Sequence, residues 1–223
     1  MTDPGKAEKL GNEAKEARAA VEHGENIRDS VRNITLAALQ RGRLDALETK
    51  RVVRSVIQGA SQAVGKAGSK SQQALGEALA GIDDALAKSA EASRLAIEEA
   101  AGRLRDYSRH DLEKAFNELK ALENMFLDTV REVADHSAAE ARETLQNLLQ
   151  HARNSGTSAG GTASAAITSL EQKLGRTLRE VAAAGTDSAL STSSKLAEAA
   201  AGFLAGIADA LDAKAKSLRK DKK

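Results

Sequence analysis

The side chains of this sequence that could do chemistry begin with four histidines: His23, His110, His136 and His151. No two of them have the i, i+4 spacing with which a helix presents two ligands to one metal ion. Polar residues stand beside each one, so we interpret all four as surface residues. The sequence therefore predicts no metal site.

Two pairs of adjacent carboxylates, Asp83-Asp84 and Glu98-Glu99, are candidates for acid–base chemistry. A catalytic carboxylate needs burial or a charged neighbour to shift its pKa. Both pairs stand among alanines, which indicates the solvated face of a helix. We therefore expect no catalytic and no cofactor-binding residues, and we do not expect an enzyme.

The stretch NSGTSAGGT at 154–162 is the most glycine-rich part of the chain and could in principle cradle a phosphate. A phosphate-binding loop follows a strand and carries a lysine, whereas this stretch follows an expected helix and has none. We interpret it as a linker, at a domain or hairpin boundary.

Two basic clusters could contact phosphate groups electrostatically. The first is Arg41, Arg43, Lys50, Arg51 and Arg54, and the second is the tail Lys214, Lys216, Arg219, Lys220, Lys222 and Lys223. No aromatic residues are interleaved with either cluster, and the formal net charge is only +1. Nucleic acid is therefore an unexpected partner. The tail is a possible contact for an anionic surface, or simply a solubilising terminus.

The elements that position these residues should all be helices. About a fifth of the chain is alanine, the best helix former, and there is one proline. No alternating run of β-branched and aromatic residues indicates a strand. The fold class is therefore all-α, an elongated bundle of five or six long alanine-rich amphipathic helices with coiled-coil-like packing.

Glycine, serine and asparagine clusters give the expected helix boundaries. Helices are expected at 8–40, 44–64, 72–106, 163–184 and 188–218. A further helical segment follows 72–106 and ends at 153, and residues 107–111 either break the helix there or continue it. The corresponding regions are N-terminal helices at 1–65, a hairpin or coiled coil at 66–153, the linker at 154–162, C-terminal helices at 163–218 and a basic tail at 219–223.

Two apolar stripes mark the expected core. Between residues 75 and 104 apolar positions recur every eleven residues, a period that keeps a stripe nearly straight along a helix. From 112 to 148 a bulkier stripe has ordinary three-to-four spacing and includes Phe126, which we expect to be buried.

One octapeptide occurs twice, as LAGIDDAL at 79–86 and as LAGIADAL at 204–211. Leu79, Ile82 and Leu86 share one helix face, as do Leu204, Ile207 and Leu211. Gly81 and Gly206 lie on a second face of small residues. Because a glycine inside a helix costs about 1 kcal/mol relative to alanine, its recurrence suggests close approach of a second backbone. We therefore expect two equivalent central helices; the alternative is a partial duplication with no such contact.

Two resemblances follow from these patterns. The segments DLEKAFNELKALENMFLDTVREVADHS (111–137) and AGFLAGIADAL (201–211) resemble an uncharacterised family of bacterial all-helical proteins. The alternation of Ala, Leu, Lys and Glu, with the stripe at 75–104, is similar in composition to phasins, which coat polyester granules, and to exchangeable apolipoproteins. Neither resemblance implies a site residue.

The expected function is therefore a non-enzymatic structural, scaffolding or protein-interaction role. The expected partners are further copies of the chain or another helical protein. The alternative is a phasin-like coat on polyester or lipid. The sequence has no cysteine, no signal peptide and no apolar run of the length needed to cross a membrane, so we expect a cytoplasmic protein without cofactors.

Overall fold

The computed structural model describes residues 4–41, 44–64, 69–102, 109–174 and 199–208. Within these ranges the chain is an all-α bundle, as predicted, and no strand occurs. Seven helices are labelled: α1 (Pro4–His23), α2 (Ile27–Gln40), α3 (Ala46–Ala63), α4 (Ser69–Gly102), α5 (Arg109–Asp135), α6 (Ala139–Ser155) and α7 (Ser158–Leu174). Residues 199–208 form a further short helical segment.

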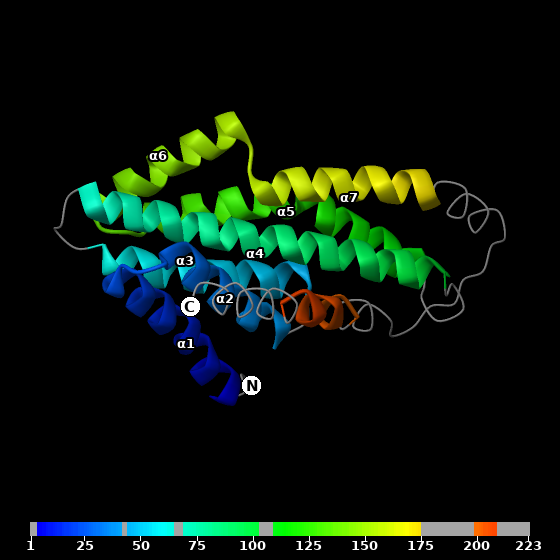
Figure 1. The fold of residues 1–223 in the computed structure, drawn as a ribbon, viewed down its shortest axis with the longest axis horizontal. Helices are drawn as coiled ribbons and strands as arrows, with labels where there is room; N and C mark the ends of the chain where they lie inside the picture. Colours follow the sequence, from blue (N-terminus) through cyan, green and yellow to red (C-terminus); the bar gives the residue numbers. More distant parts are fainter. Residues whose placement is uncertain (1–3, 42–43, 65–68, 103–108, 175–198, 209–223) are drawn as a thin grey trace, which may run out of the picture.

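The long helix α4 runs through the middle of an elongated bundle (Figure 1). It packs against α2 on one side and against α7 and α5 on the other, while α1 packs mainly on α3 and α6 on α5. One core cluster includes side chains from α1 to α7 and from the 199–208 segment. Phe126 is 4% exposed and belongs to this core, which confirms the sequence prediction.

The predicted helix 8–40 is two helices. Gly24 has φ +73° and Asn26 has φ 49° and ψ 40°, so the chain turns between α1 and α2 in left-handed conformations. Glycine and asparagine adopt this region most readily, which is why the chain reverses there. The prediction of one helix over 8–40 was therefore wrong.

The expected continuous segment up to residue 153 is also divided, into α5 and α6. Ser137 Oγ donates to Val133 O (2.8 Å), and the Arg142 guanidinium donates to Ala134 O (3.3 Å) and Ser137 O (3.1 Å). These bonds satisfy carbonyl groups that a helix end leaves without intrahelical donors. The α4–α5 connection at 103–108 lies outside the described residues, so the structure describes only that α4 ends at Gly102 and α5 begins at Arg109.

The linker predicted at 154–162 is wrong for most of its length. Only Gly156 and Thr157 separate α6 from α7, and Gly156 has φ +77°. α7 then packs on α4 and α5, so within the described residues no domain boundary divides 66–153 from the helix that follows. The predicted helix end at 184 and the whole of 219–223 lie outside the described residues.

Candidate functional site

The octapeptide of α4 lies where three helices meet, and its Gly81 faces α2. A Cβ at Gly81 would overlap the carbonyl oxygen of Arg28 and would lie 3.0 Å from the backbone nitrogen of Arg32. Ile82 and Leu86 are fully buried and Leu79 is 8% exposed. The close approach expected from the sequence therefore exists here, and it lets the α2 and α4 backbones touch.

Asp84 of α4 adds an ion pair to the same contact between α2 and α4. Arg28 Nε donates to Asp84 Oδ2 (2.7 Å) and Arg28 Nη2 donates to Asp84 Oδ1 (2.9 Å). This two-pronged geometry is the strong form of an arginine–carboxylate pair. The hydrogen bonds from the guanidinium and the charge of Asp84 raise the pKa of Arg28.

Asp83, the neighbouring residue, faces the other way and binds the start of α7. Ser158 N donates to Asp83 Oδ2 (2.7 Å) and Ala159 N donates to Asp83 Oδ1 (2.9 Å). The first N–H groups of a helix have no intrahelical acceptors, and a carboxylate there also interacts favourably with the helix dipole. Asp83 is thus an N-terminal cap supplied by a residue far away in the sequence.

A second carboxylate caps the same helix from α5. Glu123 Oε1 accepts from Thr157 N (3.1 Å) and from Thr157 Oγ1 (2.8 Å), and Thr157 Oγ1 accepts from Gly160 N (2.9 Å). A Cβ at Gly160 would overlap the Glu123 carboxylate, so glycine leaves room for this side chain over the first turn. Asp83 and Glu123 together explain why α7 begins inside the predicted linker.

A third carboxylate, that of Glu98 in α4, binds the C-terminal end of α7. Lys173 Nζ donates to Glu98 Oε1 (2.9 Å), and Arg94 Nη1 also donates to it (2.5 Å). Partial burial raises the pKa of Glu98, but the hydrogen bonds from Lys173 and Arg94 outweigh it and leave the pKa below its usual value. The carboxylates Asp83, Asp84 and Glu98 were predicted to be solvated, and each is instead engaged by another helix.

The partners at the two ends of α7 show its direction. Ser158 bonds to Asp83 and Lys173 bonds to Glu98, and each pair is 75 positions apart in the sequence. A constant offset means that α7 runs parallel to α4 in one register. Figure 1 shows the two helices side by side.

The second octapeptide differs from the first. Leu204 is fully buried, Ile207 is half-buried and Gln40 Nε2 donates to Leu204 O (3.4 Å). Gly206 is exposed, and no described atom lies within 4 Å of a Cβ placed there. Within the described residues the close backbone contact expected at Gly206 is therefore not present, so the described surroundings of Gly81 and Gly206 differ. Leu211 lies outside the described residues.

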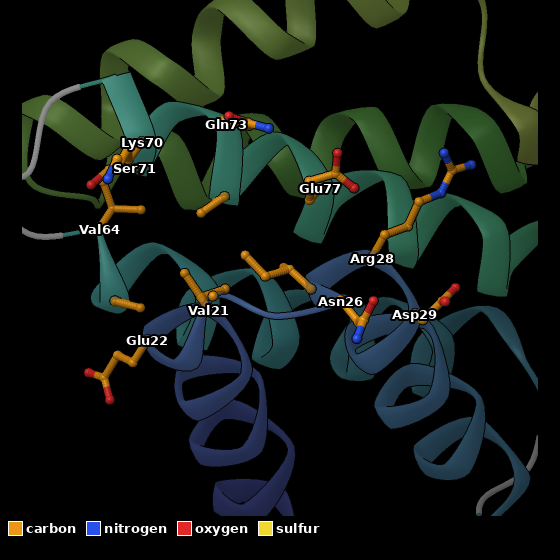
Figure 2. Close-up of a pocket in the computed structure, with 14 residues that line it drawn as sticks. Val21, Glu22, Asn26, Arg28, Asp29, Val64, Lys70, Ser71, Gln73 and Glu77 are labelled. Carbon is orange, nitrogen blue, oxygen red and sulfur yellow. The ribbon is translucent and has the colours of Figure 1, made fainter. Parts of the chain in front are cut away.

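A cleft of about 870 Å³ lies at one end of the bundle (Figure 2). Lys70, Gln73 and Glu77 of α4 form one wall, and the α1–α2 turn with Asn26 and the last residues of α3 form the others. Its other charges are already paired, in Arg28–Asp84, Arg18–Glu22 and Arg32–Asp29. The described lining therefore presents separated charges and no converging set of catalytic groups.

The basic cluster of α3 is largely neutralised inside the molecule. Lys50 Nζ donates to Glu132 Oε1 (2.7 Å), Arg54 also binds Glu132, and Arg51 binds Glu48. The hydrogen bond from Lys50, together with Arg54, holds the pKa of Glu132 below its usual range. Arg41 is exposed at the end of α2, and Arg43 lies outside the described residues. Lys50, Arg51 and Arg54 are therefore already paired with carboxylates, which leaves few cations of this cluster to contact a phosphate group.

α5 also supplies an acidic residue to the start of α3. Asp45 is the N-cap of α3 and accepts from Glu48 N (2.9 Å), while Glu118 accepts a hydrogen bond from the backbone of Ala46. Burial raises the pKa of Glu118. α5 thus contacts α3 and α7 through three acidic side chains along its length, those of Glu118, Glu123 and Glu132.

The histidines take no part in this arrangement. His23, His136 and His151 are exposed, as predicted, and His23 and His136 each contact a carbonyl oxygen of their own helix. The side chain of His110 lies outside the description. In the described parts of the chain no group of three acidic or histidine residues could hold a metal ion. The tail residues 214–223 lie outside the described residues.

Sequence reasoning missed several residues of these interhelical contacts: Arg28, which binds Asp84, Glu123, which binds Thr157, and Lys173, which binds Glu98. One signal was available for Asp83: it is the position at which the two octapeptides differ, with Ala208 in the second copy. No local signal marks Glu123 or Lys173, because their roles depend on which helices become neighbours.

The fold and these contacts define an all-α bundle whose helices are joined by backbone-close packing and by interhelical carboxylates. The chain belongs to a family of unknown function, DUF6781, whose model matches residues 5–213. This confirms the predicted membership of an uncharacterised helical family; the phasin-like character stays a prediction. No curated protein and no solved structure is detectably similar to the chain. None of the described helices is long and apolar enough to cross a bilayer.

Proposed function

We propose that the protein is a non-enzymatic scaffold or protein-interaction module that works as a folded helical bundle and associates with copies of itself or with another helical protein in the cytoplasm. The observation that carries this proposal is that α4 binds a different helix on each of two sides. Gly81 and Asp84 hold α2, while Asp83 and Glu98 hold α7.

The distribution of apolar groups supports the same proposal. Within the described part of the chain, Leu47 is a large hydrophobic side chain that is exposed, at 81%. The other large hydrophobic side chains described there are mostly buried. A coat protein needs an apolar face to present to its surface. A closed bundle with buried apolar faces suits a scaffold better.

Sedimentation velocity combined with small-angle scattering tests this proposal. We expect an elongated particle with a mass of two or more chains. A compact globular monomer at all concentrations would count against it.

A phasin-like coat on polyester or lipid is the second candidate, and one observation favours it. The faces that the helices bury are rich in alanine, as in Ala159, Ala163 and Ala166 of α7. Alanine buries little apolar area, so opening such a seam costs less than opening one built from leucine. Flotation with liposomes or polyester particles at low salt tests this candidate, and absence of binding removes it.

A further inference from the structure

The contact of α7 with the rest of the bundle is built from small side chains. Its buried residues are Ala159, Ala163, Ala166 and Leu170, and Ile167 is half-buried. The opposite face, which includes Ser164 and Thr168, is exposed. At roughly 25 cal/mol per Å² of buried apolar surface, such a strip contributes little per residue. Apolar packing therefore holds α7 less firmly than helices with larger buried side chains.

α7 is also a weak helix by itself. It has 17 residues and carries Gly160 and Gly161 in its first turn. Glycine is the least favourable ordinary residue in a helix, and in proteins most helical stability comes from tertiary packing rather than from propensity. The helix therefore depends on its contacts with α4 and α5 to stay formed.

Charged contacts at both ends supply much of that dependence. Asp83 and Glu123 cap the first turn, and Lys173 pairs with Glu98 near the last turn. The Lys173 side chain is 56% exposed and that of Glu98 is 22% exposed. Water and salt can therefore reach this pair and screen it.

The connection before α7 permits movement. Gly156 has φ +77°, and no described atom lies within 4 Å of a Cβ placed there. Two residues separate α6 from α7, and Gly156 N donates to Ala152 O (2.8 Å) at the end of α6. Among the described residues, a change of backbone direction at Gly156 meets no steric obstacle on the side of its missing Cβ.

α2, on the other side of α4, is held differently. Its buried residues include Ile27, Val31, Leu36 and Leu39, and its backbone touches Gly81. Larger side chains and a backbone contact resist separation in a way that an alanine strip does not.

We propose that α7 is a releasable helix, which leaves α4 and α5 while the rest of the bundle stays folded. Its release exposes the strip from Ala159 to Leu170 together with the faces of α4 and α5 that it covers. Charge neutralisation or salt at Asp83 and Glu98 controls the equilibrium. This inference does not rest on the scaffold proposal, because release can occur in a monomer or in an assembly.

Hydrogen–deuterium exchange on the full-length chain tests the proposal, with Asp83→Asn and Asp84→Asn as matched variants. The two aspartates are adjacent, but the first binds α7 and the second binds α2. Asp83→Asn removes the charge and one of the two acceptor oxygens at the start of α7, so it should speed exchange of the 158–174 amides several-fold, with the 27–40 amides unchanged. Asp84→Asn should leave the 158–174 amides unchanged.

The unmodified chain supplies a second measurement that needs no variant. In the native protein the 158–174 amides should exchange faster than those of 75–100, and faster still when NaCl is raised from 50 mM to 1 M. The proposal is overturned if the α7 amides exchange only as slowly as those of α4. It is also overturned if the two variants affect α7 equally.

Discussion

The two copies of the octapeptide have almost the same sequence but occupy different surroundings. In the first copy Gly81 lies against the backbone of α2, and Asp83 and Asp84 bind α7 and α2. In the second copy Gly206 is exposed and no described atom lies within 4 Å of a Cβ placed there, although Leu204 is buried like Leu79. Leu79 and Leu204 are therefore alike in burial, whereas Gly81 and Gly206 have different surroundings.

The difference arises because a leucine needs only an apolar neighbourhood, whereas a glycine is useful only if a backbone arrives opposite it. A buried leucine gains free energy from any well-packed apolar contact. The gain from omitting a side chain depends on one particular neighbour at one particular height along the helix. Local sequence encodes the first requirement and not the second.

Gly81→Leu is the substitution expected to have the largest effect. The new side chain must displace the α2 backbone at Arg28, which cannot move away as a flexible side chain could. Overpacking typically costs about 1–3 kcal/mol, and the roughly 1 kcal/mol gained in helix propensity offsets part of it. The clash is with backbone, so the net free energy of unfolding should fall by up to about 2 kcal/mol in urea denaturation. A rise in stability would mean that α2 does not touch α4 at this residue.

Asp83→Ala makes the first octapeptide identical to the second and should have the next largest effect. The start of α7 loses the acceptor for Ser158 N and Ala159 N, and loss of a cap costs about 0.5–2 kcal/mol. The measurement is the thermal midpoint together with amide exchange in α7. The matched control is Ala208→Asp, which restores LAGIDDAL in the second copy. Because Ala208 is half-buried against the core, this control is read in the exchange of the 158–174 amides, which should be unchanged since Asp83 still caps α7.

Gly206→Leu should have a smaller effect of the opposite sign to that of Gly81→Leu. Among the described residues the site is open, so helix propensity is the main change, and leucine is favoured over glycine by up to about 1 kcal/mol. Urea unfolding should show a rise of up to that size. A fall in stability would show that another helix covers Gly206 in solution, as in an oligomer.

Lys173→Met should have the smallest effect, which appears as a change in acid sensitivity. The pKa of Glu98 is lowered in the folded state. As the pH falls below the ordinary glutamate pKa of about 4.3, the unfolded chain therefore binds more protons than the folded chain. Its contribution is therefore complete at pH 7 and is lost as the pH falls through the lowered value. Removing Lys173 should reduce the stability difference between pH 7 and pH 3 by about 0.5 kcal/mol or less, since the pair is partly exposed. Identical pH profiles would show that Lys173 does not hold Glu98.

Sequence reasoning predicted the features that depend on composition and short-range pattern. Alanine content and the single proline predict an all-α chain, and apolar spacing identifies the buried stripe from Leu75 to Ile97 and the burial of Phe126. Such patterns succeed because one amphipathic helix specifies which of its own faces is apolar.

The errors have a common physical cause, which is contact between distant parts of the chain. NSGTSAGGT looks like a linker because its own residues favour turns, yet Asp83 and Glu123 satisfy the N–H groups that let a helix begin at Ser158. The turn at His136 was available in principle, since Ser137 and Glu140 have the spacing of a capping box. No pattern within the octapeptide distinguishes Gly206 from Gly81.

The parallel register of α7 on α4 has a consequence for the order of assembly during synthesis. Parallel neighbours cannot be joined by a short hairpin, and here two other helices, α5 and α6, complete the crossover before Ser158 can reach Asp83. Contacts 75 positions apart form late, because the intervening chain must first be made and its loop closed. At a synthesis rate of about 5–20 residues per second, the face of α4 that receives α7 is uncovered for roughly 4–15 s after it leaves the ribosome. A nascent chain therefore offers chaperones and neighbouring chains the surface that the finished bundle keeps closed.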